Sequence, residues 1–137
     1  MKNSEKVSEF MVTYGQDVSG IEAFLKLGEY VAFRRRLVEE ELDEMDQAIG
    51  LLSVYDILIE MFDAGLDILY FGYGTLLGLG LTPEIIEAGM AEVHRSNMSK
   101  LDENGKPIFR EDGKVLKGPN YSPPDLRKVL QAYKKIP

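Results

Sequence analysis

Two acidic stretches of this chain have the residue types and spacing to hold a cation. Six carboxylates occupy the eight residues Glu39–Asp46, and a second set, Asp56, Glu60, Asp63 and Asp67, follows within a mostly apolar stretch. Carboxylates on an apolar helix face are costly unless a cation lies between them. Ligand sets made only of oxygen suit hard ions such as Mg²⁺ or Mn²⁺. The two stretches therefore predict a divalent-metal site.

The first stretch divides into two faces when it is projected as a helix at about 100° per residue. Glu40, Glu41 and Glu44 fall on an arc that also carries aromatic and aliphatic residues. Glu39 and Asp43 fall on another arc, where a solvated surface is the simplest interpretation. For the first three residues, a solvated face and a functional site both stay open.

The second stretch predicts a buried helix with all of its acids on one face. Relative to Glu60, the residues Asp56, Asp63 and Asp67 fall within about 60° of arc, and large apolar residues cover the rest. Like charges stacked in a low dielectric need protonation, basic partners or metal ions. The nearest basic cluster, residues 34–36, is expected to point mostly elsewhere on its own helix, which favours metal. The role of Asp56 stays open.

Other residue types exclude several kinds of chemistry. There is no cysteine, which excludes a disulfide framework, a zinc–thiolate site and a thiol nucleophile. The single histidine, His94, lacks a glutamate three residues earlier, so it does not match a di-iron helix bundle, and we expect it to be structural. Ser96 and Ser99 have no base at a recognisable spacing.

Composition predicts one globular, cytoplasmic domain over residues 1–137. Of the 137 residues, 45% are hydrophobic and 28% charged, and no apolar segment reads as a signal sequence or membrane span. Residues 1–93 carry 6 basic and 18 acidic side chains, and residues 94–137 carry 10 and 5. The net charge of −7 disfavours a nucleic-acid partner. A basic tail beside an acidic metal site would suit binding of a small polyanion together with its metal ion. Alternatively, the acidic and basic parts of the chain simply attract each other.

The expected elements form a helical core at 1–98 and a basic hairpin and tail at 99–137. Apolar periodicity, caps and turn residues place these elements at Lys6–Tyr14, Glu22–Ile49 with a break near Gly28 left open, Ser53 to about Gly72–Gly74, Pro83–Met98, a turn at Asp102–Gly105, a β-hairpin at 106–110 and 114–117, and a helix at Asp125–Tyr133.

The acidic pattern resembles the EExxE…ExxD signature of the all-α nucleoside triphosphate pyrophosphohydrolases. Glu40, Glu41 and Glu44 match its first half, and Glu60 and Asp63 match its second half. This superfamily includes MazG proteins, dimeric dUTPases and phosphoribosyl-ATP pyrophosphohydrolases.

The segment EVHRSNMSKLDENGKPIFREDGKVLKGPNY, residues 92–121, is similar to the MazG-like, phosphoribosyl-ATP-pyrophosphohydrolase-like branch of bacteria and phages. The resemblance covers about residues 10–124. It implies an all-α fold with a four-helix MazG-like core and a short C-terminal β-hairpin or loop appendage. It also implies a homodimer or homotetramer that cleaves an NTP or dNTP to the monophosphate and pyrophosphate with Mg²⁺ or Mn²⁺.

The resemblance also implies roles for individual residues. Glu41 would orient or deprotonate the attacking water. The metal ligands would be Glu40, Glu44, Glu60, Asp63 and Asp67. The candidates for binding the phosphates are Asn97, Lys100, Arg95, Lys114, Lys117 and Tyr121, with Asn97 and Lys100 favoured most. For Lys114 and Lys117 a solvated hairpin stays open.

The base site and the assembly leave alternatives. Phe10, Tyr14 and Gln16 could form a wall for the base or belong to the core. The first long helix carries two apolar stripes, one of which could face a partner chain. The competing functions are a non-catalytic helical oligomer that binds metal or nucleotide, and a metal-storage bundle.

Overall fold

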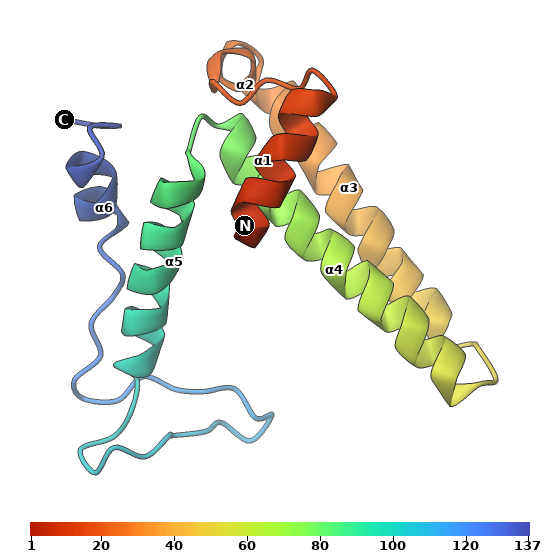
Figure 1. The fold of residues 1–137 in the computed structure, drawn as a ribbon. Coiled ribbons are helices and arrows are strands. Elements are labelled where there is room, and N and C mark those ends of the chain that lie inside the picture. The colour runs from red at the N-terminus through yellow and green to blue at the C-terminus, as the bar shows by residue number, and fades with distance from the viewer. The chain divides into compact units, whose positions relative to one another are not determined.

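The computed structural model describes residues 1–137 and divides into two compact units, 1–83 and 84–137. The helices are α1 (Asn3–Thr13), α2 (Ile21–Leu25), α3 (Leu27–Ala48), α4 (Val54–Gly78), α5 (Pro83–Met98) and α6 (Leu126–Ala132). No strand is present, so the all-α prediction is confirmed (Figure 1). The helical core expected at 1–98 is shared between the two units.

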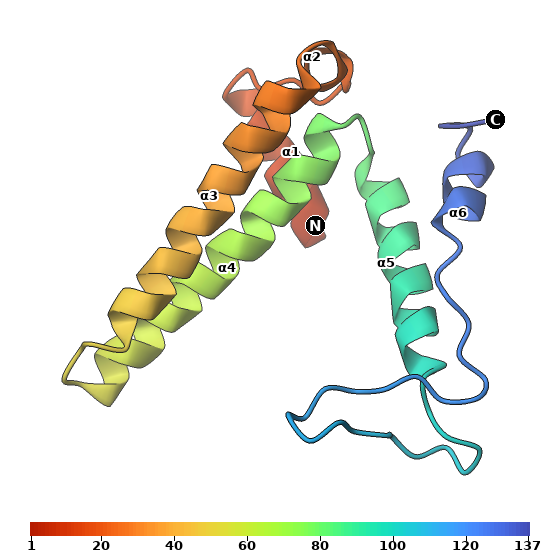
Figure 2. The same cartoon turned by 180° about the vertical axis from the view of Figure 1, so that it is seen from behind.

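The first unit is built on a long helical hairpin. The helices α3 and α4 run antiparallel and pack along their length, α1 packs on α4, and α2 contacts the start of α3 (Figures 1 and 2). Ser53 caps α4 as expected, because its Oγ accepts a hydrogen bond from the backbone N–H of Asp56 at 3.4 Å. The break between α2 and α3 falls at Lys26, whose φ is −135°, and Gly28 lies inside α3.

The helix α4 runs to Gly78, beyond the end predicted at Gly72–Gly74. Gly74 and Gly78 lie against side chains of α3, where an added Cβ would clash with the Arg34 guanidinium and with the Tyr30 hydroxyl. These glycines therefore allow close packing of α3 on α4 instead of ending the helix. Within the GYGTLLG segment, residues 72–78, these two glycines make room for the side chains of Arg34 and Tyr30 of α3.

The prediction that α4 is buried all round is wrong for this chain. Leu58, Phe62 and Leu69 expose 64%, 66% and 57% of their surface, because α1 and α3 cover only part of the helix. Among its acids, Asp67 is half-buried, whereas Asp63 is exposed, as are Asp56 and Glu60. The four acids are therefore not stacked together in a low dielectric within one chain.

The second unit consists of α5, a long loop and α6, which lies beside α5 with Leu126 facing Gly89 (Figures 1 and 2). The predicted turn at Asp102 is present, because the Asp102 carboxylate accepts the backbone N–H groups of Asn104 and Lys106. The predicted hairpin is reduced to one antiparallel bridge, between Phe109 and Val115.

No single helix has the length and hydropathy needed to cross a membrane, although α4 and α5 meet that requirement as a bent pair.

Candidate functional site

The inner face of α3 carries two charged side chains where apolar ones are usual. Its buried residues are Arg34, Glu41 and Ala48, spaced seven apart, so they form one stripe along the helix. Arg34 is 8% exposed and Glu41 is 7% exposed. Because buried charges are costly unless they are paired, each of the two needs a physical explanation.

Glu41 lies in a group of carboxylates contributed by both long helices. We call Glu41, Glu44, Asp63 and Asp67 the acidic cluster. Burial raises the pKa of Glu41, and the nearby charges of Glu44, Asp67 and Asp63 raise it further. The Oε2 atom of Glu41 is buried and has no hydrogen-bond partner. A buried oxygen without a donor, surrounded by negative charge, is a position where a cation would be stabilising.

The other predicted metal ligands lie outside this cluster. Glu40 and Glu60 are exposed, and neither makes a hydrogen bond or an ion pair. No three acidic or histidine side chains converge closely enough to hold an ion. The ligand types of the acidic cluster nevertheless suit a hard divalent cation, because the cluster offers only carboxylate oxygens. One of them, Oε2 of Glu41, is buried without a hydrogen-bond partner. Glu44 and Asp63 are exposed, so their side chains have room to change rotamer.

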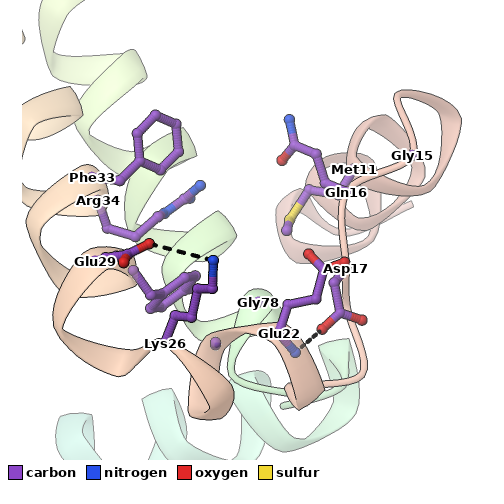
Figure 3. A pocket seen from close by; sticks show the side chains of 12 residues that line it. Met11, Gly15, Gln16, Asp17, Glu22, Lys26, Glu29, Phe33, Arg34 and Gly78 are labelled. Atoms are coloured by element: carbon purple, nitrogen blue, oxygen red, sulfur yellow. Dashed lines mark hydrogen bonds and ion pairs between the residues drawn. The ribbon is translucent and has the colours of Figure 1, made fainter.

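A pocket of about 490 Å³ lies in the first unit, and its nearest residue on α3, Arg34, is about two turns before Glu41. Figure 3 shows Phe33 and Arg34 on one side of it and Met11 and Gln16 on the other. Its volume is in the range of small-molecule sites, which are typically about 300–1,000 Å³. The pocket therefore has the size and aromatic lining of a ligand site.

Hydrogen bonds to α4 fix the side chains on the α3 side of the pocket. Arg34 donates from Nε to Thr75 Oγ1 at 3.0 Å and from Nη2 to the Phe71 carbonyl at 3.0 Å. Tyr30 donates its hydroxyl to the Thr75 carbonyl at 2.6 Å. Burial lowers the pKa of Arg34. The guanidinium is thus held rigidly by neutral acceptors, and no carboxylate pairs with it.

Of the three residues considered either for a base wall or for the core, one lies at this pocket. Gln16 lines it, whereas Phe10 and Tyr14 do not. Phe10 stacks on Tyr14 with the ring centroids 4.5 Å apart and meets Tyr70 edge-on at 5.6 Å. Sequence reasoning missed Arg34 as a pocket residue. Its seven-residue spacing from Glu41, together with the glycines of α4, was the available signal.

In the second unit, Arg95 makes hydrogen bonds that fix the C-terminal segment on α5. It forms a bidentate pair with Glu92, with both bonds at 2.8 Å, and it also donates to the Pro123 carbonyl. Glu92 accepts the backbone N–H of Asp125 as well. The hydrogen bonds from Arg95, and then from Asp125, lower the pKa of Glu92 to about 2. These contacts join α5 to the segment before α6.

The remaining phosphate-binding candidates form two pairs and a single residue. Lys100 donates from Nζ to Asn97 Oδ1 at 2.8 Å. The ammonium of Lys117 lies 4.7 Å from the ring centre of Tyr121, within reach of a cation–π interaction. Lys114 is exposed at the end of the bridge turn, where its backbone N–H binds Asp112.

No protein-family model and no curated protein sequence matches this chain. Among solved structures, it is similar to a crystal structure of "a putative NTP pyrophosphohydrolase" from Exiguobacterium sp. 255-15. The two share 24% sequence identity and a TM-score of 0.51 over 98% of this chain and 97% of that one. The similarity shows that the two proteins share an all-α fold.

Proposed function

We propose that this protein is a nucleoside triphosphate pyrophosphohydrolase that releases pyrophosphate from an NTP or dNTP. The observation that carries the proposal is Glu41, a buried carboxylate with an unpartnered oxygen inside the acidic cluster. The EExxE…ExxD pattern and the fold shared with the Exiguobacterium protein support it. In this reaction, water attacks phosphorus, the anhydride bond between the α- and β-phosphates breaks, and pyrophosphate leaves.

Glu41 is the residue that we assign to the attacking water. Its raised pKa makes it a better proton acceptor than an exposed carboxylate. Its unpartnered Oε2 could accept a hydrogen bond from that water and then its proton, which passes on to solvent. In this way, Glu41 would orient and activate the nucleophile.

The remaining acids would hold Mg²⁺ or Mn²⁺. Glu44, Asp63 and Asp67 would provide the inner ligands, and Glu40 and Glu60 would provide outer oxygens after a change of rotamer. A bound divalent ion would neutralise charge on the phosphate oxygens, which is the main requirement of phosphoryl transfer. Lys100, Lys114 and Lys117, with Asn97 and Tyr121, stay our candidates for binding phosphate oxygens. Arg95 is the weakest candidate, because its guanidinium already forms a bidentate pair with the Glu92 carboxylate.

We also propose that the protein assembles with a second copy of itself. Leu58, Phe62, Leu66 and Leu69 form a stripe along α4 at helical spacing, and each is at least 48% exposed. Contiguous apolar patches of this kind mark interfaces between proteins. The resemblance implies a dimer or a tetramer. In either assembly, a second copy of the chain could cover this apolar stripe.

The proposal is tested by measuring pyrophosphate release from a panel of NTPs and dNTPs with Mg²⁺ or Mn²⁺. We expect turnover of one or a few nucleotides to monophosphate and pyrophosphate, and a loss of at least about 100-fold in Glu41→Gln. Asp43→Asn is the matched control, because Asp43 is an exposed acid on the same helix, outside the acidic cluster.

Each possible result has a distinct meaning. Turnover lost only in Glu41→Gln supports the enzyme. Metal binding without turnover of any nucleotide would replace the proposal with the non-catalytic module or the storage bundle. Equal turnover in Glu41→Gln and the wild type would show that the acidic cluster is not the active site.

A further inference from the structure

The charge of Arg34 is not satisfied by any acid in its pocket. Three acids and two bases line this pocket: Asp17, Glu22 and Glu29, with Lys26 and Arg34. The Asp17 carboxylate accepts backbone N–H groups of its own turn, at 2.8 Å and 3.0 Å. Glu29 pairs with Lys26, at 3.9 Å. None of the three acids forms an ion pair with Arg34, so this guanidinium is available to a ligand.

Arg34 also has donors to spare. Its two hydrogen bonds to α4 use Nε and one N–H of Nη2, and a guanidinium carries more N–H groups than these. Figure 3 shows its end directed into the pocket, toward the side where Gln16 lies. None of these donors is buried without a partner, so they reach solvent, where a ligand that presents an oxygen at this point would replace water.

The lining indicates what kind of group carries that oxygen. With three acids against two bases, the pocket has a formal net charge of −1, which disfavours a polyphosphate. A neutral, flat group fits better, because Phe33 and Tyr30 supply aromatic surface. The side-chain amide of Gln16 offers both an acceptor and donors from the other side.

We propose that Arg34 makes the enzyme selective for nucleobases in which a keto oxygen adjoins a ring N–H. Arg34 would donate to the keto oxygen, and Gln16 would accept the ring N–H. Guanine, hypoxanthine, uracil and thymine have this pattern. Adenine and cytosine place an amino group at the same position, and this donor would face the donors of Arg34. The inference rests on the proposed function, since it assigns the base of the same substrate.

The helix geometry agrees with this division of the substrate. Arg34 and Glu41 are seven residues apart on one stripe of α3, which separates them by about 10 Å along the helix axis. A nucleotide with its base at Arg34 would direct its phosphates toward the acidic cluster. The pocket would therefore bind the base and leave the phosphates to the acids and their metal.

Two matched pairs of nucleotides test the inference. The dIMP/dAMP pair and the dUMP/dCMP pair each differ in a single keto-for-amino exchange. Their dissociation constants are measured by calorimetry, without turnover, for the wild type, Arg34→Gln, Gly74→Ala and Arg35→Gln. In the wild type, the keto member of at least one pair should bind about 5- to 150-fold more tightly, the range of discrimination for a well-placed hydrogen-bonded contact to a base.

The variants assign the preference to Arg34. In Arg34→Gln the ratio should fall to near one. Gly74→Ala keeps the arginine but displaces its guanidinium, so it should have the same effect if the first variant does not fold. Arg35→Gln removes an exposed charge that pairs with Glu39, and it should keep the ratio.

The outcomes separate this inference from the proposed function. A wild-type ratio near one in both pairs, or a preference for the amino member, overturns the role of Arg34, even if pyrophosphate is released. A ratio that persists in Arg34→Gln overturns it too. If no monophosphate binds and no triphosphate is hydrolysed, both the proposed function and the inference fail.

Discussion

Gly74 and Gly72 offer a matched test of how α4 receives the side chain of Arg34. Both glycines lie inside α4, two residues apart. A Cβ at Gly72 would meet nothing within 4 Å, whereas one at Gly74 would overlap Nη2 of Arg34 and lie 3.2 Å from its Cζ. Alanine at the two positions should therefore change stability in opposite directions.

The magnitude for Gly74→Ala follows from what the guanidinium would lose. Displacing Arg34 breaks its bonds to Thr75 and Phe71, and a hydrogen bond to a charged group contributes about 1.5–3 kcal/mol. Water in the pocket would recover part of this, and alanine in a helix contributes about 1 kcal/mol relative to glycine. We expect a net loss of about 1–4 kcal/mol. Gly72→Ala should gain up to about 1 kcal/mol.

The assay is thermal unfolding of both variants and the wild type at one protein concentration. For a chain of this length, 1 kcal/mol corresponds to about 3–5 °C in Tm. Gly72→Ala should therefore unfold at least about 3 °C above Gly74→Ala. If Gly74→Ala were as stable as Gly72→Ala, the guanidinium would not lie against α4, and the geometry assigned to the pocket would be wrong.

Three further predictions concern the acids and the apolar stripe. The folded pKa of Glu92 is about 2, below its usual 4.5, so the stability that its carboxylate contributes is complete above pH 4.5 and is lost as the pH falls toward 2. The difference in unfolding free energy between wild type and Glu92→Gln should therefore shrink as the pH is lowered from 4.5 to 2. Glu41 has a raised pKa, so its ionised form opposes folding above its folded pKa. Without metal, Glu41→Gln should be more stable than wild type at pH 7, and the gap should close on acidification, as measured by thermal unfolding across that pH range. Phe62→Glu should lower the mass seen by light scattering at least twofold, whereas Leu52→Glu, which changes an exposed loop residue, should not.

Local sequence signals predicted the helices well where a cap or a turn residue fixed their ends. The helix predicted at Pro83–Met98 has these bounds in the structure, and the helix predicted to start at Ser53 begins at Val54, with Ser53 as its N-cap. Glycine misled the same reasoning. The sequence predicts a helix end at Gly72–Gly74, but the missing Cβ of Gly74 makes room for a side chain of α3, and that contact depends on tertiary packing.

The site was harder to predict, because periodicity reports which residues share a face and not what covers that face. The apolar surface around Leu58 and Phe62 indicated burial, yet in one chain it is exposed. Residues 34–36 looked like one basic cluster, yet Arg34 is buried while Arg35 and Arg36 are exposed. Only the packing of α3 on α4 distinguishes these arginines.

The two buried charges of α3 are best explained together. A buried ionisable residue usually stabilises a fold less than an apolar residue of similar volume does. Packing alone therefore does not explain Arg34 or Glu41 at these positions. Arg34 lacks an acidic partner, and Glu41 has like charges around it and an oxygen without a donor. They do not compensate each other, because about two turns of helix separate them. A ligand with a hydrogen-bond acceptor at one end and a metal-bound anion at the other would satisfy both. A keto-bearing nucleotide is such a ligand, and this is why we assign the base to Arg34 and the phosphates to the acidic cluster.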